Sequence, residues 1–261
     1  SPHNKASKGA ALLMAMLTMA LVASLAASAV WRQWRNVEVE AAERGRDQAL
    51  WILSGAQDWG RLILRQDAIS GSVDHMAEPW SIPLAESRAT TFLSDGAAGQ
   101  QDDDALNAIL SGHIDDLQSR LNVYQLIKNQ EISDTHLLAF SRLFDALELP
   151  QSELDTLVEQ LRLSLSTAGS QDDHYPIAPN QLQDLQSLGL SSATLNKLMP
   201  YISWLRAETT ININTARWPV LYATLDGIDQ ADAKKIVQAR LSAHFTLSLI
   251  HISEPTRLQL I

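Results

Sequence analysis

Histidine is the residue type in this sequence with the widest chemical use, because a neutral imidazole can accept a proton or bind a metal near pH 7. The seven histidines are His3, His75, His113, His136, His174, His244 and His251. No two are four positions apart, the spacing that sets two metal ligands on one helix face. The sequence also has no cysteine, no Gly-x-Ser-x-Gly elbow and no phosphate-binding loop. Because these patterns give no support to catalysis, we expect a protein that is not an enzyme.

Acidic residues form two further candidate groups. Asp74 and Glu78 lie close to His75 and make a candidate acid–base cluster. A run of three aspartates, residues 102–104, is consecutive, so it does not alternate ligands with glycine as a calcium loop does. We expect that run to belong to a solvated loop.

A weak internal repeat suggests a different chemistry. Residues 185–202 and 222–239 align with Gly189 on Gly227, and each copy has the pattern helix, glycine turn, helix. The second turn resembles the helix-hairpin-helix module that binds DNA phosphates. In that module a second glycine ends the turn, whereas here Asp229 would repel a phosphate. Lys234 and Lys235 could compensate, and a DNA-binding protein therefore stays the alternative to a structural or protein-binding module.

Charge is distributed unevenly over the 261 residues. The net charge is −10, but residues 1–35 hold Lys5, Lys8, Arg32 and Arg35 and no acid. The remainder is therefore more acidic than the total. An acidic body repels nucleic-acid phosphates, which argues against a protein that coats a duplex.

An uncharged apolar segment occupies residues 10–30, a helix length that spans a hydrocarbon core of roughly 30 Å. Trp31 and Trp34 follow, where indoles favour the membrane–water interface. A secretory signal peptide is the alternative, because Ala27-Ser28-Ala29 is an acceptable cleavage site. Residues 37–69 lack proline and repeat apolar positions at helical spacing, which favours one long helix that continues out of the membrane.

A short basic leader that ends in glycine before such a helix resembles the class III signal of type IV pilins and pseudopilins. Four motifs follow in order: VDHMAEPW at 73–80, SGHIDDLQSRLNVYQL at 111–126, GSQDDHY at 169–175 and TTININTA at 209–216. Together they resemble the K-type minor pseudopilins of the type II secretion system, also called the general secretion pathway protein K family. The resemblance runs from about residue 8 to about residue 245, and it implies that the acids around His75 form a structural turn at Trp80.

The resemblance implies how the chain is processed and where it acts. Prepilin peptidase would cut between Gly9 and Ala10, which makes Met14 the fifth mature residue. Most pseudopilins carry Glu there to meet the amine of the subunit ahead, and the K-type family lacks it. A subunit without that Glu has no subunit ahead, so we expect this chain at the tip of the pseudopilus, where it helps to initiate and cap assembly.

The same resemblance implies partners and location. The partners would be the I- and J-type minor pseudopilins, the prepilin peptidase, the inner-membrane secretion platform and membrane lipid, with no nucleic acid. The chain would cross the inner membrane once, with its body in the periplasm. The alternative function is a membrane-anchored periplasmic helix-hairpin-helix protein for DNA binding or uptake.

The expected fold class is α+β, with a long N-terminal helix, a small antiparallel pilin-like sheet and a large helical insertion. Domain by domain, we expect a leader at 1–9, a transmembrane helix at 10–30, a pilin-like helix and sheet at 31–126, a helical insertion at 127–208, and a strand with a helix-hairpin-helix-like segment at 209–246. Residues 109–115 and 119–126 are expected to form a hairpin. The helical insertion should bury one stripe between Leu137 and Leu147 and another between Leu154 and Leu161.

Two expectations concern calcium and the C-terminus. The K-type family is associated with calcium in acidic loops, and Asp172 and Asp173 are the candidate ligands here. Two carboxylates do not supply the six to eight oxygens of a calcium site, so a solvated acidic loop stays the alternative. The segment 247–261 resembles translated adapter sequence, and we expect that it is not native.

Overall fold

The computed structural model describes residues 6–71, 73–88, 109–166, 176–246 and 249–250. The chain divides into two compact units. The first combines residues 1–62 with 84–112, and the second combines residues 63–83 with 113–261. The predicted boundaries follow sequence order, whereas both units are built from segments that are apart in the sequence.

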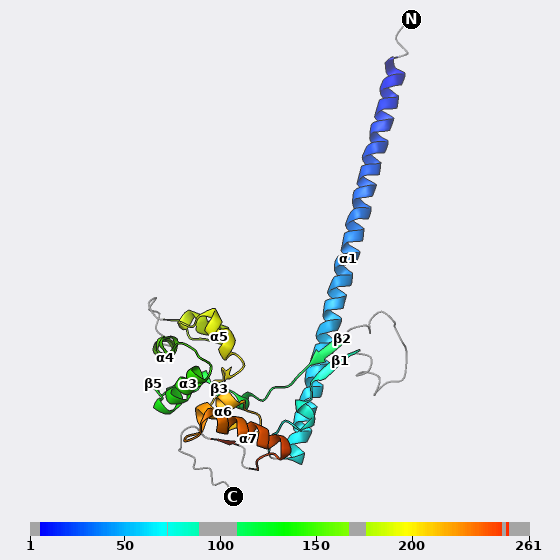
Figure 1. Ribbon diagram of the computed structural model, residues 1–261. Coiled ribbons are helices and arrows are strands. Elements are labelled where there is room, and N and C mark those ends of the chain that lie inside the picture. Colours follow the sequence, from blue (N-terminus) through cyan, green and yellow to red (C-terminus); the bar gives the residue numbers. More distant parts are fainter. Residues whose placement is uncertain (1–5, 72, 89–108, 167–175, 247–248, 251–261) are drawn as a thin grey trace. The chain divides into compact units, whose positions relative to one another are not determined.

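One continuous helix, α1 (Ala6–Ser70), begins the chain (Figure 1). No proline interrupts it, and the predicted long helix is confirmed. Over residues 10–30 its large apolar side chains are exposed, from 57% for Leu21 to 76% for Met19. By length and composition, α1 can cross a membrane.

The first unit also holds an antiparallel pair, β1 (Leu84–Arg88) with β2 (Ile109–Gly112), in which Leu84 lies opposite Gly112. The predicted hairpin of residues 109–115 with 119–126 is therefore wrong.

Asp116 caps a 3₁₀ turn, η2 (Leu117–Ser119), by accepting a hydrogen bond from the Gln118 backbone N–H. After this turn β3 (Leu121–Asn122) pairs in parallel with β6 (Ile202–Ser203) in the second unit.

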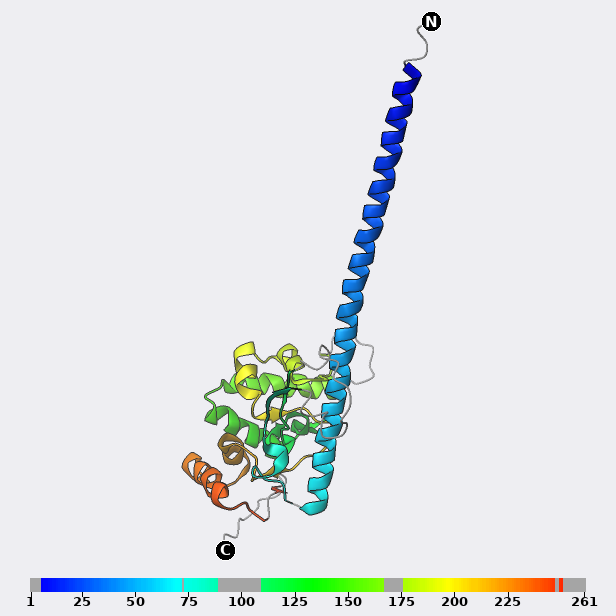
Figure 2. The ribbon, with the colours of Figure 1, turned by 90° about the vertical axis from the view of Figure 1, so that its right-hand side faces the viewer.

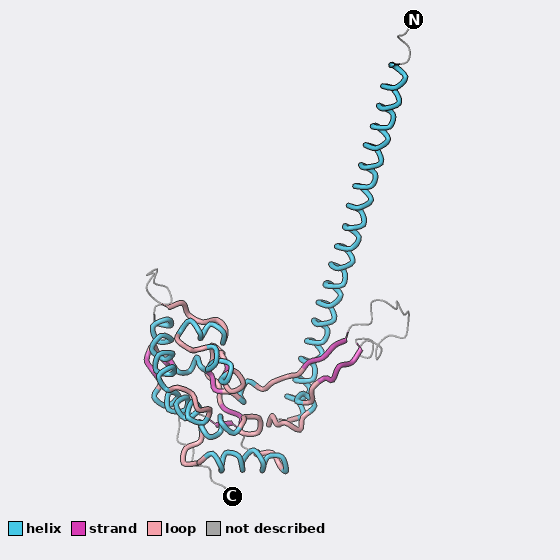
Figure 3. Tube along the Cα trace, turned by 45° about the horizontal axis from the view of Figure 1, so that its top comes forward, coloured by secondary structure: helices cyan, strands magenta, loops and turns pink. Residues whose placement is uncertain are grey.

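The strands of the second unit are short, as Figure 3 shows in magenta. β4 (Ile127–Lys128) and β5 (Glu131–Ile132) form a tight hairpin through Asn129 and Gln130, both with positive φ. β7 (Ile211–Asn212) pairs with β8 (Leu249–Ile250). Two 3₁₀ turns, η1 (Pro79–Ser81) and η3 (Val123–Leu126), complete the connections.

Helices supply most of the core of the second unit. α3 (Asp134–Ala146) and α4 (Gln151–Ser166) pack against each other, and they are followed by η4 (Leu182–Leu188), α5 (Ser192–Leu198), α6 (Trp218–Thr224) and α7 (Gln230–Ser242) (Figures 1 and 2). The predicted stripe of α4 is buried throughout. In α3, however, Leu138 is 57% exposed, because it lies on the opposite face from Phe140 and Phe144. The α+β class is confirmed.

The predicted repeat is present as two helix–turn–helix units. In the first, η4 and α5 are joined through Gly189, and in the second, α6 and α7 are joined through Gly227. Both glycines have positive φ, +107° and +76°, which is why glycine stands at each turn. Ser191 and Asp229 then cap the following helices by accepting hydrogen bonds from the backbone N–H groups of Thr194 and Asp232.

Candidate functional site

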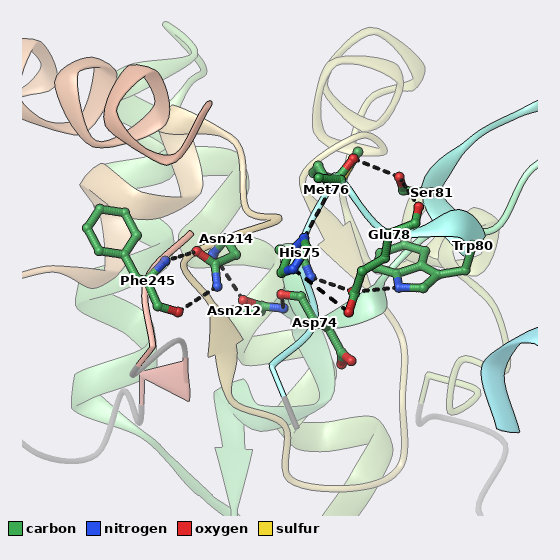
Figure 4. A network of polar contacts seen from close by, with 10 residues as sticks. Asp74, His75, Met76, Glu78, Trp80, Ser81, Asn212, Asn214 and Phe245 are labelled. Carbon is green, nitrogen blue, oxygen red and sulfur yellow. Dashed lines mark hydrogen bonds and ion pairs between the residues drawn. The ribbon is translucent and has the colours of Figure 1, made fainter. Parts of the chain in front are cut away.

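The segment that follows α1 folds into a turn around Trp80, which is 5% exposed. One oxygen of Glu78 accepts hydrogen bonds from the His75 backbone N–H and from the indole N–H of Trp80, both at 2.8 Å (Figure 4). The Ser81 hydroxyl donates to the carbonyls of Met76 and Glu78. These contacts confirm the predicted structural turn. Two of them engage one oxygen of the Glu78 carboxylate, which ties this side chain to the turn.

Two buried asparagines lie beside this turn. Asn212 is 0% exposed and Asn214 is 1% exposed. The side-chain N–H₂ of Asn212 donates to the Asp74 carbonyl and to the Asp116 carboxylate, both at 3.1 Å, and its side-chain oxygen accepts from the Asn214 backbone N–H at 3.0 Å. We call Asn212, Asn214, Thr215 and Asp116 the asparagine hub.

Asn214 connects the hub to the segment after α7. Its N–H₂ donates to the Phe245 carbonyl at 3.0 Å, and its oxygen accepts from the Phe245 backbone N–H at 2.8 Å (Figure 4). The amide therefore pairs with Phe245 as a neighbouring strand would. Next to this contact the rings of His244 and His75 stack, with centroids 4.1 Å apart and planes 15° apart. Arg240 of α7 donates to the carbonyls of Ile213 and Ala216, at 2.8 and 2.6 Å.

Asp116 connects the hub to the segment before β3. Its Oδ2 accepts hydrogen bonds from the Thr215 hydroxyl at 2.5 Å and from Asn212, while its Oδ1 accepts from the Gln118 N–H at 2.8 Å. Farther along, Asn122 donates to the carbonyls of Leu205 and Ala207. Three of the four motifs that carry the family resemblance thus meet in one polar network. The fourth, 169–175, lies outside the described residues.

Carboxylates are concentrated at one side of this network. Oxygens of Asp67, Asp74 and Glu78 all lie within 4.8 Å of one another, close enough to share a cation. Burial and the nearby carboxylate of Glu78 raise the pKa of Asp67, while burial and Asp116 raise the pKa of Asp74. Three carboxylates, one of them already holding two N–H groups, offer fewer oxygens than calcium takes.

The predicted site residues do not meet in one place. Gly9, Ala10 and Met14 lie along α1, where the Met14 side chain is 67% exposed. Asp172 and Asp173 lie outside the described residues, so the calcium expectation stays a prediction. Sequence reasoning missed the roles of Asn212 and Asn214. Their alternation with Ile211 and Ile213 gave no signal for these roles, because such a pattern is typical of exposed polar side chains, whereas all four residues are buried.

The helix–turn–helix repeat is fixed by side chains at the places where a phosphate would have to bind. In the first copy Glu153 of α4 accepts the Ser191 N–H at 2.9 Å. In the second copy Arg142 donates to the carbonyls of Leu225 and Ile228.

The lysines of the second copy are also engaged. Lys234 lies over the Trp218 ring at 4.5 Å, and Lys235 pairs with Asp232 at 2.8 Å. The exposed turn itself presents Asp226 and Asp229. This arrangement favours a structural module over a DNA-binding one, because the turn offers carboxylates where a phosphate would bind.

The fold and the site define a class of protein: an α+β body, assembled by a buried polar hub, behind an N-terminal helix of membrane-spanning length. A family model described as "Type II secretion system (T2SS), protein K" matches residues 211–247, which hold β7, α6 and α7. Type II secretion system protein K of Pseudomonas aeruginosa is 27% identical, over 90% of this chain and 73% of its own length. The Klebsiella pneumoniae protein of the same name is 26% identical, over 97% and 81%.

A solved structure shows the same fold. It is the crystal structure of the GspK-GspI-GspJ complex from the enterotoxigenic Escherichia coli Type 2 Secretion System, and the match has a TM-score of 0.52 at 15% identity over 79% of this chain and 73% of that one. The predicted resemblance is confirmed: over most of its length this chain is similar to type II secretion system protein K.

Proposed function

We propose that the chain acts as a minor pseudopilin of type II secretion, anchored in the inner membrane by α1 with its body in the periplasm. The observation that carries this proposal is the similarity to type II secretion system protein K over 90% of the chain. The length and apolar composition of α1 support the membrane anchor. In this role the chain is a non-enzymatic assembly subunit. The hub supports that role, because the carboxylate of Asp116 and the amides of both asparagines are hydrogen-bonded within the protein.

The proposed partners are the I- and J-type minor pseudopilins, the prepilin peptidase and the inner-membrane platform. A likeness to a chain of the GspK-GspI-GspJ complex supports the first two. Co-purification of the membrane-extracted full chain with the I- and J-type proteins from the same source tests them. We expect a stable complex, and recovery of this chain without either partner would contradict the proposal.

Processing gives an independent test. If prepilin peptidase acts on the chain, mass spectrometry should find a mature N-terminus at Ala10, because glycine lets extended backbone enter a site at the membrane face. Gly9→Val should leave the precursor in the membrane, while Gly45→Val, farther along α1, should not affect cleavage. A mature N-terminus at Val30 would instead indicate a secretory signal peptide.

A further inference from the structure

The end of the apolar segment of α1 carries two indoles and two guanidinium groups within five residues. Trp31 and Trp34 are 60% and 54% exposed, and their ring centroids lie 5.5 Å apart. Arg32 and Arg35 are exposed as well. We call these four residues the Trp–Arg belt.

The geometry directs Arg32 toward the apolar segment. Its Nε donates to the Ser28 carbonyl and its Nη2 to the Ser28 hydroxyl, both at 3.3 Å. Ser28, Arg32 and Arg35 share one helix face, because they are four and three positions apart. Helical side chains lean toward the N-terminus of their helix. The two arginines therefore occupy the level at which the apolar segment ends.

The charges of the belt have no carboxylate partner among the described residues. Within the described part of the chain, neither Arg32 nor Arg35 lies within ion-pair distance of a carboxylate, whereas Arg44 of the same helix pairs with Glu40 at 2.5 Å. In a protein whose body lies outside the cytoplasm, arginines at this end of the span run against the usual excess of positive charge on the cytoplasmic side. A local anionic partner would account for them.

We propose that the Trp–Arg belt binds the phosphate headgroup of an anionic phospholipid. The guanidinium groups would pair with the phosphate oxygens, which a planar fork of N–H donors suits. The indoles would lie among the headgroups, where their N–H groups can reach polar partners. This inference rests on the proposed membrane anchoring of α1, and it names the lipid chemistry that α1 recognises.

The test uses the full chain in nanodiscs of phosphatidylcholine with a minor fraction of phosphatidylglycerol, followed by native mass spectrometry of the lipids that stay bound. Wild type should retain phosphatidylglycerol preferentially. Arg32→Gln/Arg35→Gln should reduce that preference by roughly 25-fold, since each of the two arginines near a charged surface contributes about a fivefold effect. The matched control Arg44→Gln/Arg46→Gln removes the same charge farther along α1 and should behave as wild type.

The outcomes separate this inference from the proposed function. If the chain enters nanodiscs but wild type shows no preference for phosphatidylglycerol, or if both double variants lose it equally, the belt does not bind the headgroup and the inference is overturned. If the chain fails to enter nanodiscs of any composition, the proposed membrane anchoring itself fails. Arg32→Lys/Arg35→Lys should keep part of the preference, because charge is retained without the planar fork.

Discussion

The side chains of Asn212 and Asn214 are fully buried, yet each has partners for both ends of its amide. This matters because a buried amide without partners destabilises the folded state, whereas one with partners fixes which segments come together. Asn212 contacts Asp74 across 138 positions and Asp116 across 96. The hub is thus the place where the polar motif residues determine the packing of the second unit.

Asn212→Ala should therefore cost about 2 to 3 kcal/mol of unfolding free energy, because the Asp74 carbonyl and the Asn214 N–H lose their partner inside the protein. Urea unfolding of the detergent-solubilised chain, followed by near-ultraviolet circular dichroism, measures this. Exposed Asn196 is the matched control, and Asn196→Ala should change the free energy by less than about 0.5 kcal/mol. Equal effects at the two positions would contradict a structural role for the hub.

Gly189 combines two constraints that Gly227 does not share. Its φ is +107°, and a Cβ added there would lie 2.6 Å from Cγ2 of Thr156, whereas a Cβ at Gly227 would meet nothing within 4 Å. Gly189→Ala should therefore cost more than Gly227→Ala, for which backbone strain alone predicts about 1 kcal/mol. Thermal unfolding of both variants provides the comparison.

The clash at Gly189 has its own control. Thr156→Ser removes Cγ2 and keeps the hydroxyl that donates to the Ser152 carbonyl. Combined with Gly189→Ala, it should recover part of the loss but leave the backbone strain. If the double variant is no more stable than the sum of the two single changes predicts, the side-chain clash is not the cause.

At the scale of elements, the two helix–turn–helix copies are held by opposite charges. Glu153 of α4 holds the N–H side of the first turn, and Arg142 of α3 holds the carbonyl side of the second while lying 4.6 Å from the centroid of the Tyr222 ring. The two copies therefore share a backbone pattern, but the side chains that anchor them, Glu153 and Arg142, differ in charge. Both anchors come from the pair of helices that precedes the repeat, so α3 and α4 determine how the two copies pack.

The first anchor has a pH signature. The hydrogen bond from the Ser191 N–H lowers the pKa of Glu153 in the folded protein. The ionised Glu153 carboxylate therefore stabilises the fold fully above its unfolded pKa, near 4.5, and this stabilisation is lost as the pH falls through the lower folded pKa. Glu153→Gln keeps an acceptor oxygen and removes the charge. It should lower stability by at most about 1 kcal/mol at pH 7, since the group is partly exposed.

The difference between Glu153→Gln and wild type should shrink toward zero as the pH falls well below 4.5. Thermal unfolding from pH 3 to pH 7 measures it. The control is Glu131→Gln, which removes the same charge from an exposed position of β5. If this stability difference is the same at every pH, the charge of the Glu153 carboxylate does not contribute to its contact with Ser191.

At the scale of the whole molecule, Met14 carries our prediction of where the chain stands in an assembly. A carboxylate in a membrane span is expensive unless it is paired, by about 2.5 to 3.5 kcal/mol on insertion scales. Met14 offers no carboxylate to a subunit ahead. We therefore predict that this subunit has nothing above it and initiates the pseudopilus at its tip.

Met14→Glu and Met19→Glu test this position in a secretion assay. Both place a carboxylate on the exposed apolar surface of α1, and only position 14 is the fifth residue after Gly9. At a tip both carboxylates are unpaired, so the two variants should reduce secretion to a similar degree. If Met14→Glu is tolerated and Met19→Glu is not, a neighbouring amine pairs with position 14 and the tip assignment is wrong.

The elements that the sequence predicted are those with a local signal. α1, both stripes of the helical insertion and both helix–turn–helix copies follow from apolar spacing and from glycine at turns. Leu138 was predicted to be buried and is exposed, because the apolar pattern alone does not show which of two adjacent leucines points to solvent. The family resemblance likewise rested on short motifs that are readable in order along the chain.

The strand pairing and the hub were decided by tertiary structure alone. Strands of two residues, such as β3 and β7, have too few positions to show an alternation, so their partners depend on which distant segments meet. The hairpin expected within residues 109–126 failed for this reason. Asn212 shows the same limit, since a polar side chain next to isoleucines indicates exposure until Asp74 and Asp116, both far away in the sequence, provide the hydrogen bonds that allow its burial.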